Sequence, residues 1–323
     1  MLAALTMPVR AQTPVLLPAG DNPIVRVMVR SGTVIVRTWS RGDVQVVSGK
    51  PVIARSFRPE AVAQALSAGS IPIFATTISA PDGPLTLPPE ELTLGALPGG
   101  PHEGVLVQAQ GGDLTLTIPS GTALLLANVG RGRIDLQDYR GGIFALLVHN
   151  GGLRLRNVAG TGFVQSARGV IMVGNSSFDH LRARTAIGNI FFENCVAKQI
   201  DVSSVTGTII YDNGSFEPGL ARFETERGNV ALGLGRGNAQ INAHSSTGQI
   251  FAALDRATVR PGQTDAQFGG YGAAVTASSV HGAIFVYRGP LRSLGGRRLG
   301  SEWMALTRFV QRRSPPKPSG RIH

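Results

Sequence analysis

A glycine returns about every twenty residues along much of this chain, and each time it opens the same short pattern. The stretches Gly188-Asn-Ile-Phe-Phe-Glu-Asn and Gly207-Thr-Ile-Ile-Tyr-Asp-Asn show the pattern most plainly. We call these glycines the anchors, and they are Gly32, Gly112, Gly132, Gly151, Gly169, Gly188, Gly207, Gly228, Gly248 and Gly282. Residues two and four positions after each anchor are apolar, which is the alternation of a strand with one buried face.

A second alternation precedes the anchors. Residues seven and five positions before almost every anchor are also apolar, as Ile200 and Val202 are before Gly207. The unit before Gly169 departs from this rule, because Gly162 takes the first apolar position. Each unit of about 20 residues therefore predicts two short strands and two turns. Since one unit cannot bury its apolar side alone, we expect successive units to stack edge to edge as an all-β, parallel β-helix-like β-solenoid over residues 24–288.

One polar column supports this register. Five consecutive units carry Asn or Asp six residues after the anchor, at Asp138, Asn157, Asn175, Asn194 and Asn213. Asn and Asp tolerate the left-handed turn conformation, and stacked Asn side chains can hydrogen-bond along the stacking axis. We therefore expect a structural ladder at these five positions.

Two segments interrupt the repeat. The insertion at residues 50–104 is rich in proline and is expected to project from the repeat, with one short helix in the stretch at 58–69. A loop is expected at residues 255–272. No proline lies between residues 120 and 217, where it would remove an amide from the strand ladder.

The two ends of the chain differ from the body. Residues 1–11 resemble the second half of a secretory signal peptide that starts upstream, and a plain disordered N-terminus is the alternative. The tail at 289–323 is basic, and "SEWMALTRFVQRR" predicts a short helix near residues 301–313. Residues 287–323 carry nine Arg or Lys against one Glu, which is +8 of the net +11. Because the body is nearly neutral, no specific nucleic-acid partner is expected.

Few residues suggest chemistry. Stacking would place Glu193 beside Asp212, a weak candidate pair for a metal ion or for acid–base work, although a solvated face is the simpler interpretation. The six histidines share no metal-ligand spacing, and Cys195 is expected to be a small packing residue. The Arg41-Gly42-Asp43 tripeptide fits a tight turn between strands. We therefore predict no catalytic residue, no metal and no cofactor.

An apolar stripe is less expected. Three residues after the later anchors, where side chains should face outward, the chain carries Met172, Phe191, Ile210, Ala231, Phe251 and Phe285. Such a stripe does not stay in water without a reason. The C-terminal helix could cover it, or the stripe could serve self-association or an envelope partner.

The stretch "SGTVIVRTWSRGDVQV" and units such as "TGTIIYDN" and "TGQIFAAL" resemble the bacterial adhesin-like β-strand-repeat family, a domain of unknown function, over about residues 24–288. The resemblance implies a bacterial, exported interaction module of the periplasm, cell envelope or extracellular space, and it supplies no catalytic residues. We expect a non-enzymatic surface or envelope scaffold whose partner is a protein, a glycan or an anionic lipid. The alternatives are a self-assembling homo-oligomer and, third, a polysaccharide-active parallel β-helix enzyme.

Overall fold

The computed structural model describes residues 14–57, 70–73, 76–80, 83–87, 90–93, 103–235, 239–254, 264–268 and 272–291. Within these ranges the chain is all-β and contains no α-helix, so the all-β class expected from the sequence is confirmed for this part of the protein. The two expected helices, at 58–69 and 301–313, lie outside the described residues, as do residues 1–11 and most of the loop at 255–272.

The strands follow one another with short turns over most of the chain. They are β1 (Val15–Pro18), β2 (Ile24–Trp39), β3 (Asp43–Ser48), β4 (Val52–Phe57), β5 (Ser70–Ile73), β6 (Thr76–Ala80), β7 (Gly83–Leu87), β8 (Glu90–Thr93), β9 (Gly104–Ala109), β10 (Leu114–Pro119), β11 (Leu124–Gln137), β12 (Ile143–Arg156), β13 (Ala159–Arg168), β14 (Ile171–Gly174), β15 (Ser177–Ile187), β16 (Ile190–Glu193), β17 (Val196–Thr206), β18 (Ile209–Phe216), β19 (Leu220–Arg227), β20 (Val230–Leu234), β21 (Ala239–Ser245), β22 (Ile250–Ala253), β23 (Asp265–Phe268), β24 (Ala273–His281) and β25 (Ile284–Arg288).

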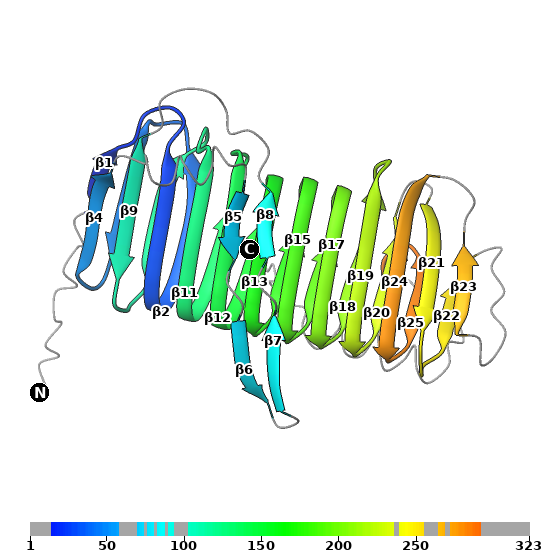
Figure 1. Ribbon diagram of the computed structural model, residues 1–323. Coiled ribbons are helices and arrows are strands. Elements are labelled where there is room, and N and C mark those ends of the chain that lie inside the picture. The colour runs from blue at the N-terminus through cyan, green and yellow to red at the C-terminus, as the bar shows by residue number, and fades with distance from the viewer. Residues whose placement is uncertain are drawn as a thin grey trace, which may run out of the picture.

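The repeat units contribute strands to two rows, which run side by side along the molecule (Figure 1). The first row has the order β4-β9-β2-β11-β12-β13-β15-β17-β19-β24-β21-β23. The second row has the order β1-β3-β10-β2-β11-β12-β14-β16-β18-β20-β25-β22. Repeat strands pair in parallel, so equivalent residues of neighbouring units lie side by side.

The register follows the anchors. Gly132 pairs with Gly151, and Ile190 pairs with Ile209, the residue at the same position of the next unit. The apolar positions on both sides of the anchors form one buried core between the rows, where Val202 and Ile209 are fully buried. This continuous core is the main source of stability, since each unit covers the apolar side of its neighbours.

The units do not stack in sequence order at the two ends, which corrects the expectation that successive units are neighbours. The unit of Gly32 lies between those of Gly112 and Gly132, because β2 pairs with β9 and β10 on one side and β11 on the other. The unit of Gly282 likewise lies between those of Gly228 and Gly248. At both ends the chain passes over one unit within an ordinary step of about 20 residues, from Gly112 to Gly132 and from Gly228 to Gly248.

The anchors form a column of close backbone contacts. A Cβ atom built on Gly188 would overlap the carbonyl oxygen of Gly169, and every other anchor except the first in the stack meets the preceding anchor in the same way. Eight anchors, including Gly188, also have positive φ. In β2, β11 and β12 the strand continues through the anchor, where we expected two separate short strands. The glycine bends the chain there while pairing continues on both sides.

The exception at Gly162 is explained by its neighbour. Gly162 pairs with Phe144 of the preceding unit, and a Cβ atom on Gly162 would overlap the Phe144 ring. The ring contacts Tyr139 edge to face at 5.8 Å and lies 6.4 Å from the Phe178 ring. One large ring therefore fills the core space of two units.

The insertion does not simply project, as its proline content suggested. Its first strand, β4, pairs with β9 in antiparallel orientation and extends the first row. The remaining strands form two antiparallel pairs, β5 with β8 and β6 with β7. The strand β6 lies against β13 and β7 against β15. Phe163 of β13 and Arg184 of β15 face outward from the main core, yet both side chains are buried.

Antiparallel strands close three of the four row ends within the described residues. In the second row, β3 and β1 continue beyond β10. In the first row, β4 lies beyond β9 at one end and β23 lies beyond β21 at the other. A reversed strand cannot continue the parallel stacking of the units. These strands therefore protect the stack against the addition of another molecule in the same register.

Candidate functional site

The five ladder residues lie in one column. Asp138, Asn157, Asn175, Asn194 and Asn213 all adopt left-handed backbone conformations, with φ between 50° and 54°. Side-chain amides donate hydrogen bonds from Asn157 to Asp138 (2.8 Å), from Asn194 to Asn175 (3.2 Å) and from Asn213 to Asn194 (2.7 Å). Backbone amides of this column also donate to the next unit, as Asn194 does to Asp212. The column therefore fixes one corner of the stack.

A second polar column lies inside the stack and has no counterpart among the sequence predictions. In five of the later units the Ser or Thr three positions before the anchor donates a hydroxyl hydrogen bond to the anchor carbonyl of the neighbouring unit, as Ser204 does to Gly188 at 3.2 Å, whereas the buried Thr185 hydroxyl makes no such bond. Ser166, Thr225, Ser279 and Ser245 make the same bond. The Ser or Thr at this position was visible in the sequence, but the acceptor is identifiable only once the stacking order is known.

The candidate pair Glu193 and Asp212 lies side by side in β16 and β18. Glu193 is exposed, whereas one Asp212 oxygen accepts hydrogen bonds from the Tyr287 hydroxyl (3.0 Å) and the Leu291 amide (2.8 Å). A Cβ atom on Gly233 would overlap the Tyr287 ring, so this glycine leaves the space that the ring occupies. Asp212 thus holds the chain that follows β25, rather than presenting a carboxylate ready for chemistry.

The apolar stripe is in register, as the anchors require. Met172, Phe191 and Ile210 pair in that order, and Phe285 stacks on Phe251 at 5.0 Å between ring centroids. Ile210 and Phe285 are buried, although they face away from the main core, while Met172 at one end is 36% exposed. Tyr287 and Leu291 pack on this part of the stripe in a separate apolar cluster. The chain after β25 therefore covers the middle of the stripe.

Cys195 is a core residue. Its thiol is 1% exposed and lies 3.4 Å from the carbonyl oxygen of Glu193. Burial raises the pKa of this thiol to about 11, because the thiolate would lose its hydration.

The Arg41-Gly42-Asp43 tripeptide occupies the turn between β2 and β3, where Trp39 donates a hydrogen bond to the Asp43 carbonyl at 2.8 Å. The guanidinium of Arg41 lies over the Trp39 ring, 5.0 Å from its centroid.

A straight polar row crosses the outer face of six strands in the first row. We call it the polar track, and its members pair in register from β15 to β23: Arg182, Asp201, Arg222, Thr276, Asn242 and Gln267. Two shallow hollows lie along the track and share Thr276. With strands about 4.8 Å apart, five steps give a track about 24 Å long.

Charged groups lie along the β15–β19 part of the track. Arg182 Nε lies 3.4 Å from Asp201, and Arg222 Nε lies 3.7 Å from Glu224 on the same strand. His180 lines the same hollow as Arg182, and burial of its ring, with a smaller effect of the Arg182 charge, lowers its pKa. Cations and anions alternate here, so this end of the track suits a polar partner rather than a purely anionic one.

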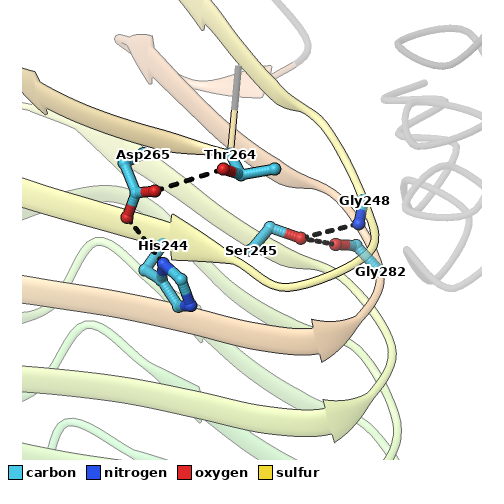
Figure 2. A network of polar contacts seen from close by, with 6 residues as sticks. All are labelled: His244, Ser245, Gly248, Thr264, Asp265 and Gly282. Carbon is cyan, nitrogen blue, oxygen red and sulfur yellow. Dashed lines mark hydrogen bonds and ion pairs between the residues drawn. The ribbon is translucent and has the colours of Figure 1, made fainter. Parts of the chain in front are cut away.

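The far end of the track carries a His–Asp pair. Figure 2 shows His244 of β21 facing Asp265 of β23, with Nδ1 2.6 Å from Oδ1. Thr264 donates a hydroxyl hydrogen bond to the other Asp265 oxygen at 3.1 Å. These two hydrogen bonds, that of His244 first, lower the pKa of the Asp265 carboxyl. Nearby, Ser245 joins the anchors Gly282 and Gly248 (Figure 2). The pair fixes the end strand and leaves both side chains exposed to a partner.

No cluster of three or more His, Cys, Asp or Glu side chains able to hold a metal ion occurs in the described ranges. In the same residues no helix is long and apolar enough to cross a membrane.

Comparison with known proteins assigns this chain to no family. No family model matches the chain, and no curated protein matches it. A solved structure similar in part is a "putative cell adhesion protein" from Clostridium sporogenes, with a TM-score of 0.28 and 8% sequence identity. The alignment covers 86% of this chain and 100% of that one.

Proposed function

We propose that this protein is a non-enzymatic, adhesin-like scaffold in which a β-solenoid presents the polar track to a partner at the bacterial surface or in the cell envelope. The observation that carries the proposal is the track, because six side chains in register form one straight polar row on a rigid face. A row about 24 Å long and shallow suits an extended polymer better than a compact small molecule.

The track carries charged, hydroxyl and amide groups, the His180 and His244 imidazoles lie beside it, and all of these groups can bind sugar hydroxyls and carboxylates. We therefore propose a surface glycan as the partner, with a protein or an anionic lipid as the alternatives. In this proposal the exported location follows from the family resemblance and from the apolar stretch within residues 1–11.

Self-assembly into stacked homo-oligomers is the first alternative. It requires open row ends, and the antiparallel strands β1, β3, β4 and β23 favour the single scaffold instead. A polysaccharide-active enzyme is the second alternative. It requires carboxylates directed at a substrate, and the use of Asp212 as an acceptor for Tyr287 and Leu291 weighs against that role.

Binding to a printed array of bacterial surface glycans tests the proposal. The variant Arg222→Ala/His244→Ala removes one exposed side chain of the track and one that lines the hollow at its far end, and it is expected to lose at least about tenfold in affinity for any glycan bound by the unmodified protein. The control Arg140→Ala/His149→Ala removes the same two residue types from exposed positions outside the track and should bind normally. Equal binding by all three proteins would reject the track as the site.

Two further measurements address the alternatives. Fractionation of the native cells, with detection by antibody, is expected to place the protein outside the cytoplasm. If polysaccharide cleavage is detected, the double variant Glu193→Gln/Asp212→Asn decides whether this pair is responsible, and unchanged cleavage would exclude it.

A further inference from the structure

A third hollow lies on the same row of strands, at the opposite end from β23. Met28 of β2 and Ile53 of β4 line it together with Gln108 of β9, which pairs with both of them. Met28 is 37% exposed and Ile53 is 60% exposed, so two large apolar side chains project into solvent on one flat face. Exposed apolar side chains gathered at a hollow indicate a contact surface more often than isolated ones do.

Three arginines surround this hollow. Arg30 lines it, Arg26 lies two residues before Met28 on the same side of β2, and Arg55 lies two residues after Ile53 on β4. All three side chains are exposed. The strands β2, β4 and β9 contain no Asp or Glu, so the face is basic as well as apolar.

This combination favours an anionic lipid surface over a protein partner. Protein interfaces concentrate their binding energy in Trp and Tyr, and none of the described residues that line this hollow is aromatic. Membrane-surface proteins instead place apolar side chains at the boundary between head groups and acyl chains, with Arg or Lys around them. The flat outer face of a sheet is also suited to contact with a plane (Figure 1).

We infer that the outer face of β4, β9 and β2 is a docking site for an anionic bilayer. Met28 and Ile53 enter the head-group region, and Arg26, Arg30 and Arg55 bind lipid phosphates. The inference deepens the proposed function by naming a membrane as one attachment surface, on a part of the protein distinct from the polar track.

A fluorescent label can locate the membrane contact. Cys195 is buried, so the variant Ile53→Cys carries one accessible thiol for an environment-sensitive fluorophore. The control Leu220→Cys places the same label at a 68% exposed apolar position of β19, in the other half of the row and beside the polar track. With vesicles of equal parts phosphatidylglycerol and phosphatidylcholine, the Ile53 label should shift to the blue and the Leu220 label should not. A shift at both sites, or at neither, overturns the inference.

The basic tail requires its own control, because it could attract anionic vesicles without any contribution from this face. The variant Arg26→Gln/Arg30→Gln/Arg55→Gln should lower vesicle affinity by about 100-fold at low salt. The variant Arg312→Gln/Arg313→Gln/Lys317→Gln removes the same charge from the tail. A loss in the tail variant equal to or larger than that of the face variant overturns the inference.

The outcome is separable from that of the glycan test. Vesicle binding depends on β2, β4 and β9, whereas glycan binding depends on the track from β15 to β23. If glycans bind and vesicles do not, the inference fails and the proposed function stands. If vesicles bind through this face and glycans do not bind, the docking site stands and the polar track loses its proposed role.

Discussion

At the scale of single residues, the anchor glycines are the positions that the stack tolerates least. Two separate features require glycine at most of these positions. The backbone φ is positive, and a carbonyl oxygen of the neighbouring unit lies where a Cβ atom would be. Neither effect depends on the side chains around them. A change at an anchor therefore acts on the backbone of two units at once.

Gly188→Ala is expected to lower the free energy of unfolding by at least about 2 kcal/mol, because φ is 152° and the new methyl group meets the Gly169 carbonyl oxygen. Urea unfolding measures the loss. Gly174→Ala is the matched control, since its nearest neighbouring atom lies 4.0 Å from the added Cβ. Equal losses in the two variants would contradict the anchor argument.

The Cys195 thiol gives a pH-dependent prediction. Its pKa is raised from an ordinary value of 9.0 to about 11, so the folded protein keeps the proton that the unfolded chain releases first. This contribution to stability is complete below about pH 8.5 and is lost as the pH rises toward 11. At pH 9 iodoacetamide should therefore label Cys195 only as fast as the protein opens. Rapid labelling of the folded protein would show that the thiol is accessible.

At the scale of elements, the segment after β25 is held by hydrogen bonds to residues of two earlier units. It runs back over the units of Gly228 and Gly207, and Gly289 donates to the Leu234 carbonyl on the way. The Asp212 carboxylate accepts hydrogen bonds from the Tyr287 hydroxyl and from the Leu291 backbone amide. The apolar stripe beneath explains why the chain returns, because Leu291 buries part of it.

Asp212→Ala is expected to release this segment, since two hydrogen bonds to a carboxylate are lost at once. The Leu291 amide should then exchange its hydrogen at least about tenfold faster, measured by mass spectrometry or NMR. Asp212→Asn keeps a side-chain oxygen as an acceptor and should show most of the original protection. Unchanged exchange in the alanine variant would mean that the stripe alone holds the segment.

At the scale of the whole molecule, the antiparallel strands at the row ends set the expected association state. Light scattering during gel filtration should find a monomer for the full chain. Leu17→Pro removes an amide and a buried contact from β1, where Leu17 pairs with Val44. With the outer strand displaced, the edge of β3 becomes available and larger species should appear. A stable monomer in this variant would show that β1 does not protect the end.

The sequence by itself determined the all-β class, the unit length, the buried positions and the columns of anchors and Asn residues. These features are local, because they depend on alternation, on glycine and on turn residues within one unit. The repeat therefore predicted which residues share a face, and this is why Glu193 was placed beside Asp212 and Met172 in line with Phe191.

Only the tertiary structure decided which units are neighbours at the ends, what Asp212 binds and where the polar track and the basic apolar face lie. Equivalent units carry nearly the same apolar pattern, so the pattern cannot distinguish the neighbour of Gly32 from any other unit. That choice is seen only in the strand pairing, where β2 pairs with β9 and β10 on one side and with β11 on the other. The track and the docking face consist of outward side chains from several units. Which of these side chains become neighbours depends on the order of stacking, which no single unit encodes.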